Sequence, residues 1–111
     1  MSTPTNNFTM VAGETMTLNV TSIYETTGAL VDFTGATITW VMKQGSTTIL
    51  TKTVGVGITV TGLGTFDIAL ATGNTTGLSG EYQHECRATL ADGTVTTLFR
   101  GTATLEPTII P

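Results

Sequence analysis

Apolar and polar side chains alternate with a period of two along several short stretches of this chain. Between residues 37 and 42, Ile38, Trp40 and Met42 share one side, while threonine dominates the other. The same alternation recurs at Met16, Leu18 and Val20, at Phe66, Ile68 and Leu70, and at Tyr82, His84, Cys86, Ala88 and Leu90. In a β-strand this period buries one set of side chains and exposes the other, so each stretch predicts a half-buried strand.

Threonine supports this interpretation, because 28 of the 111 residues are threonine. Its β-branched, hydroxyl-tipped side chain suits the solvated face of a strand whose opposite face is buried. The chain is therefore predicted to be all-β.

Turn signals separate the predicted strands at short intervals, which is typical of a sandwich or barrel. Gly45-Ser46 and Asp92-Gly93 each predict a hairpin turn. Apolar positions change parity between Val95 and Leu98, which predicts a β-bulge near Thr96 or Thr97. The expected strands are residues 8–11, 15–23, 36–44, 47–54, 58–61, 65–71, 81–90 and 94–105, with a short apolar segment at 30–33 and a long polar loop at 72–80.

Hairpin-linked strands without a helical period predict an antiparallel immunoglobulin-like β-sandwich of seven or eight strands. One domain is expected, since 111 residues leave no room for a second core. It should comprise residues 8–106, with residues 1–7 as an extended N-terminal arm and 107–111 as a C-terminal tail. The paired cysteines of true immunoglobulin domains are missing, so Trp40 alone is expected to anchor the core.

The charge content excludes several classes of partner. Only 11% of residues are charged, against about 25% in ordinary soluble domains. Such a surface repels neighbours weakly, which favours dense assembly. The four cations, Lys43, Lys52, Arg87 and Arg100, are spread over separate predicted strands, so no basic patch and no nucleic-acid binding are expected. Without a signal-peptide pattern or an apolar run of about 20 residues, neither secretion nor a membrane span is expected.

His84, Glu85 and Cys86 are adjacent and could suggest a metal or nucleophile site. Period two sends His84 and Cys86 to one face and Glu85 to the other, whereas zinc needs three or four ligands. Cys86 with His84 also lacks an orienting third group for nucleophilic catalysis. Packing in the core or at an interface is the favoured role.

The remaining candidates are also expected to be structural. The carboxylates Asp32, Asp67, Glu81, Glu85 and Asp92 mostly fall at strand ends or on polar faces, where a solvated charge is ordinary. The glycine-rich run from Gly55 to Gly64 has neither a lysine nor a following helix, so it is not a phosphate loop. No catalytic residue, metal site or cofactor is expected, and the chain is not expected to be an enzyme.

The C-terminal tail carries Ile109 and Ile110, which point to opposite faces of any strand. One of them can pack on its own domain, and the other needs a partner or lies exposed. The tail is therefore expected either to close its own domain as an edge strand or to dock on a neighbouring subunit.

Several motifs together resemble a known group of proteins. They are Gly13-Glu-Thr-Met-Thr-Leu18, Gly28-Ala-Leu-Val-Asp-Phe-Thr-Gly-Ala36 leading into Ile38-Thr-Trp40, Gly64-Thr-Phe-Asp-Ile68, Leu78-Ser-Gly-Glu-Tyr-Gln-His-Glu85 and Asp92-Gly-Thr-Val-Thr-Thr97. This set resembles small immunoglobulin-like β-sandwich proteins of tailed-bacteriophage virions, which include head decoration or cement proteins and the amino-terminal domain of upper-baseplate proteins.

The resemblance implies a non-enzymatic virion protein, assembled in the host cytoplasm, whose partners are the major capsid protein or other virion proteins. A decoration or cement protein that bridges capsomers on the outer head surface is favoured, as a homo-oligomer and with a trimer preferred. A tail or baseplate structural protein is the first alternative. A carbohydrate-binding adhesin module is the second alternative. The chain has three aromatic residues that can form hydrogen bonds, Trp40, Tyr24 and Tyr82, but Trp40 and Tyr82 are expected to point inward.

Overall fold

The computed structural model describes residues 5–22 and 29–107 of the chain, which form eight strands and one short helix. The elements are β1 (Phe8–Val11), β2 (Met16–Thr21), β3 (Thr37–Gln44), β4 (Thr47–Val54), β5 (Gly57–Gly62), β6 (Thr65–Leu70), α1 (Thr72–Thr75), β7 (Gly80–Thr89) and β8 (Val95–Glu106). Neighbouring strands are hydrogen-bonded in the order β1-β8-β7-β3-β4-β5-β6-β2.

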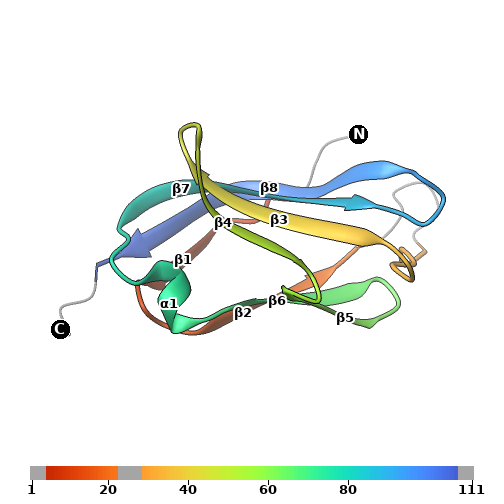
Figure 1. The fold of residues 1–111 in the computed structure, drawn as a ribbon, viewed down its shortest axis with the longest axis horizontal. Coiled ribbons are helices and arrows are strands. Elements are labelled where there is room, and N and C mark those ends of the chain that lie inside the picture. Colours follow the sequence, from red (N-terminus) through yellow and green to blue (C-terminus); the bar gives the residue numbers. More distant parts are fainter. Residues whose placement is uncertain (1–4, 23–28, 108–111) are drawn as a thin grey trace.

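The strands lie in two layers (Figure 1). One layer holds β1, β8, β7, β3 and β4, and the other holds β5, β6 and β2. The layers are joined at a corner where Thr53 and Val54 of β4 pair with Gly57 and Ile58 of β5. This pairing and that of β1 with β8 are parallel, and the other strand pairings are antiparallel. The predicted immunoglobulin-like β-sandwich is confirmed.

The core lies between the layers and is built from the positions that the period-two pattern selected. Trp40, Phe66 and Cys86 are fully buried, and Ile38 and Ile68 are as well. Trp40 pairs directly with Cys86 across β3 and β7, so the predicted inward face of both strands is confirmed.

The predicted turns are also confirmed. The Gly45-Ser46 loop links β3 to β4, and Gly45 has φ of 61°, which favours glycine. In β8, Leu98 is an extra residue, because Cys86 pairs with Phe99 and Arg87 with Thr97. The expected β-bulge is therefore present, next to Thr97. It restores the inward direction of Phe99, which is 3% exposed.

Two segments differ from a simple strand-and-loop pattern. Val31 and Phe33 are buried, and the Val31 N–H donates to the Ser22 carbonyl (3.0 Å), yet the segment forms an isolated bridge at Leu30 rather than a strand. The Asp32 carboxylate accepts the Thr34 N–H (2.9 Å) and turns the chain. The polar loop at 72–80 begins with α1, which the sequence pattern did not predict. Its Thr75 is fully buried, and the Thr75 Oγ1 accepts the Gly13 N–H (2.8 Å), tying α1 to the β1–β2 turn.

Candidate functional site

The three adjacent candidate residues on β7 point as predicted. His84 and Cys86 are buried, and Glu85 lies on the outer face of the layer. Burial, with a smaller effect from the Glu85 charge, raises the pKa of the Cys86 thiol to about 12. The thiol is thus protonated at neutral pH and cannot serve as a nucleophile there, since the thiolate is the reactive form.

His84 is the centre of a hydrogen-bonded cluster. Its Nδ1 accepts the Trp40 indole N–H (3.0 Å), so a neutral ring carries its proton on Nε2, which donates to the Asn6 carbonyl (2.5 Å). The ring is 2% exposed and lies 5.0 Å from the Phe8 ring and 5.6 Å from the Phe99 ring, between centroids. Both ring nitrogens are therefore occupied, and none is left for a metal ion.

The same cluster holds the end of the N-terminal arm against the protein's own β8. Thr5 forms a parallel bridge with Arg100, and the Asn6 N–H donates to the Arg100 carbonyl (3.0 Å). The Thr102 N–H donates to Asn7 Oδ1 (2.9 Å). Gly101 lies beneath, where a Cβ would stand 2.7 Å from Asn7 Oδ1 and closer to the Asn6 carbonyl. The described part of the arm is thus fixed to its own domain.

The environment of His84 predicts a pH-dependent stability. Burial lowers the pKa of His84, and the hydrogen bond to Asn6 opposes this less strongly. The residues around the ring, Phe8, Trp40 and Phe99, carry no titratable group, while Glu85 pairs with Arg100 on the outer face. Below pH about 6.5 the unfolded chain takes up a proton that the folded chain resists, so stability falls as the pH drops through this range.

The measurement is the urea midpoint between pH 7.5 and pH 5, above the range in which ordinary carboxylates titrate. His84 is the single histidine, so His84→Gln, whose amide can accept from Trp40 and donate to Asn6, should flatten the curve. A parent midpoint that is constant over this range, or a slope that persists in His84→Gln, would contradict the assignment.

The structure does not bring the candidate carboxylates together. Asp32 and Asp92 accept the N–H groups of Thr34 and Thr94 (2.9 Å each) and cap turns. Hydrogen bonding from the side chain and backbone of Thr34 lowers the pKa of Asp32, and that from the backbone and side chain of Thr94 lowers the pKa of Asp92. Asp67 accepts from Asn19 Nδ2 (2.7 Å). Glu85 pairs with arginine, and Glu81 is exposed near the start of β7. No acid–base pair for catalysis is found among these five.

The cations are placed differently from the sequence expectation. Lys43, Arg87 and Arg100 lie on β3, β7 and β8, which are neighbours, so the three share the outer face of one layer. The argument that separate strands keep the cations apart is therefore wrong for these three. Glu85 lies between the arginines, 3.1 Å from Arg100 Nη2 and 3.8 Å from Arg87 Nη2, and offsets their charge. Such exposed pairs contribute at most about 1 kcal/mol to stability.

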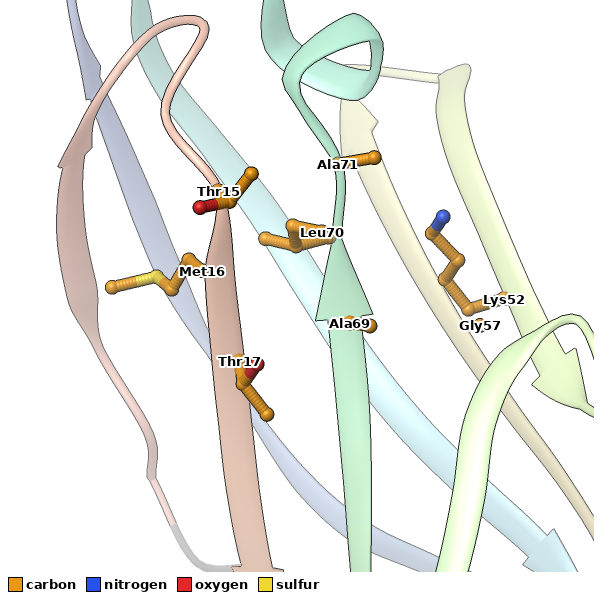
Figure 2. Close-up of a pocket in the computed structure, with 8 residues that line it drawn as sticks. All are labelled: Thr15, Met16, Thr17, Lys52, Gly57, Ala69, Leu70 and Ala71. Atoms are coloured by element: carbon orange, nitrogen blue, oxygen red, sulfur yellow. The ribbon is translucent and has the colours of Figure 1, made fainter.

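A shallow groove lies over the other layer (Figure 2). Its one charged side chain is Lys52, whose Nζ donates to Asn74 Oδ1 (2.9 Å) in α1. The groove is lined by Thr15, Met16, Thr17, Lys52, Gly57, Ala69, Leu70 and Ala71. Apart from Lys52, which is bonded to Asn74, no charged side chain lines the groove. The Lys52–Asn74 contact was not predicted, because it joins segments whose proximity depends on the fold.

Two unpaired strand edges are the other notable surface feature. Among the described strands, β1 and β2 stand at the two ends of the strand order, so each pairs with one of the others. Neither strand contains a charged residue. Proteins usually protect such edges with lysine, proline or a bulge, because exposed backbone groups pair readily with another chain.

Within residues 5–22 and 29–107, no group of three or more His, Cys, Asp or Glu side chains could hold a metal ion. In the same part of the chain, no helix has the length and apolar character needed to cross a membrane. Residues Ile109 and Ile110, on which the tail expectation rests, lie outside the described residues.

Comparisons with known proteins add little to this. No family model matches the chain, and no curated protein sequence matches it. Among solved structures, it is similar to the fibronectin(III)-like modules of Clostridium thermocellum CbhA, with a TM-score of 0.45 and 9% sequence identity over 96% of this chain and 93% of that chain. A similarity this distant transfers no function.

Proposed function

We propose that this chain is a non-enzymatic structural protein of a tailed-bacteriophage virion, and that it decorates the outer head surface and bridges neighbouring capsomers. The observation that carries the proposal is the pair of unprotected, uncharged strand edges, β1 and β2, on a domain with few charges. A subunit of a repeated lattice can use such edges, because many weak contacts multiply when neighbouring copies are held close together.

The sequence motifs support the same role. The resemblance to small virion sandwiches includes Gly13–Leu18, which covers the turn into β2, and Leu78–Glu85, which covers the start of β7. The partners would then be the major capsid protein or other virion proteins, and the location would be the virion. Within it the chain would act as a homo-oligomer. The preferred trimer stays a prediction, because no described residue tests the number of copies.

No described feature favours an adhesin. Sugar rings stack on exposed aromatic side chains, but Trp40 is fully buried and Tyr82 is 4% exposed. Tyr24 lies outside the described residues. The expectation that Trp40 and Tyr82 point inward is confirmed.

The test is to image parent particles that carry the labelled protein. Label on the head at regular positions between capsomers is expected. Label confined to the tail or baseplate would favour the first alternative, and unlabelled particles would contradict a virion role.

Truncations then test which end makes the contact. The described part of the arm caps His84 through Asn6, so removal of residues 1–7 would disturb the fold as well as assembly. Variants that lack residues 1–4, or that end at Glu106, leave that contact in place. At least one should keep the parent circular dichroism and melting temperature yet bind particles poorly. If both bind as the full chain does, neither end makes the contact.

A further inference from the structure

The two sides of the sandwich are protected differently. On one side, Lys52 of β4 points inward, its stem crosses Gly57, and its Nζ binds Asn74 (2.9 Å). A Cβ at Gly57 would collide with the Lys52 stem, so the lysine lies tightly over this side. Inward-pointing charges are one of the devices that prevent strand addition. Lys52 therefore protects this side of the molecule.

The side where β1 and β2 meet has no such protection. Figure 2 shows Met16 extending from β2 toward β1, with Lys52 on the far side of β6. β2 pairs only with β6, over six residues without a register shift. Among the described residues no strand covers its outer edge. β1 has an open edge as well, but it is only four residues long.

The backbone groups that β2 presents can be assigned from one hydrogen bond. The Ser22 N–H donates to the Gly64 carbonyl beside β6 (2.8 Å). Because backbone groups of a strand alternate in direction, the N–H and C=O groups of Thr17, Asn19 and Thr21 point away from β6. The Thr17, Asn19 and Thr21 side chains are exposed as well, so this edge is uncharged and open along its length.

We propose that the free edge of β2 pairs, antiparallel, with β2 of a second copy of this chain, across a two-fold axis at Asn19. In this register Thr17 faces Thr21 of the second copy. Leu18 faces Val20, which keeps both on the inward side. Three residue pairs then exchange two backbone hydrogen bonds each, and the two small layers form one continuous sheet.

Charge favours a second copy as the occupant of this edge. Copies of a chain with a net charge of −4 repel one another, so they associate best where carboxylates are absent or already bonded. β2 has no charged residue, and Asp67, on the neighbouring strand, accepts a hydrogen bond from Asn19 Nδ2 (2.7 Å). Because the two-fold register pairs β2 with β2, a second copy of this chain is a sufficient partner. A two-fold contact closes with two copies, so it gives a dimer where the sequence resemblance favoured a trimer.

The test is sedimentation equilibrium of the purified full chain over a range of concentrations, which is independent of any virion role. The double variant Thr17→Lys with Thr21→Lys places like charges opposite each other at both ends of the pairing. It should raise the dissociation constant of the dimer about tenfold or more. Thr17→Lys with Thr21→Glu places opposite charges there and should restore the parent value to within about threefold.

A matched control carries two lysines on the outer face of the same layer but away from β2, at the exposed Thr59 and Thr61 of β5, which β6 separates from β2. It should dimerise as the parent does, and circular dichroism of all variants should match the parent. A parent that stays monomeric, forms a trimer, or dimerises equally well with both lysines on β2 would overturn the proposal.

Discussion

Replacement of Trp40 by alanine is expected to destabilise the protein severely, because it empties the centre of the core. Trp→Ala in a packed core typically costs about 3–5 kcal/mol, and Trp40 is fully buried. The His84 Nδ1 would also lose its donor, which leaves a buried acceptor unsatisfied. With a shift of about 4–6 °C per kcal/mol, the melting temperature should fall by roughly 12–30 °C.

The measurement is thermal unfolding followed by circular dichroism. Trp40→Phe is the matched control, because it keeps an aromatic ring in the core but removes the N–H that binds His84. It should fall between the parent and Trp40→Ala. A Trp40→Ala protein that melts within a few degrees of the parent would show that Trp40 is not the anchor of the core.

The sequence was enough to predict the architecture, because burial in a sandwich follows a period of two. Ile38, Trp40 and Met42 could be placed inside from spacing alone, and all three are buried. The bulge at Leu98 could be predicted for the same reason, since a change of parity would otherwise expose Phe99.

Features that depend on which strands are neighbours could not be predicted. The sharing of one face by Lys43, Arg87 and Arg100 follows from the order β3-β7-β8, which periodicity does not specify. The roles of the inward His84 and of Lys52 likewise depend on distant segments, Asn6 and Asn74. Period two gives the direction of a side chain but not its partner.

Gly101 is expected to be the next most sensitive position after Trp40. A Cβ at this residue would stand 2.6 Å from the Asn6 carbonyl carbon and 2.7 Å from Asn7 Oδ1. The Asn6 atom is backbone, so it cannot move aside unless the arm itself shifts. Gly101→Ala should therefore displace Thr5, Asn6 and Asn7 from β8.

The displaced arm takes three hydrogen bonds with it, namely the His84 Nε2 bond to Asn6, the Asn6 N–H bond to the Arg100 carbonyl and the Thr102 N–H bond to Asn7. At about 0.5–1.5 kcal/mol for each hydrogen bond, the loss should be about 1.5–4.5 kcal/mol. Hydrogen exchange gives the local readout, because the Thr102 amide should exchange much faster in Gly101→Ala while amides of β3 change little.

Gly73→Ala is the matched control, since nothing lies within 4 Å of a Cβ added at Gly73. It should leave both the Thr102 exchange rate and the melting temperature near the parent values. If Gly101→Ala protects the Thr102 amide as well as the parent does, the arm is not held at β8 by these contacts, and His84 does not owe its burial to the arm.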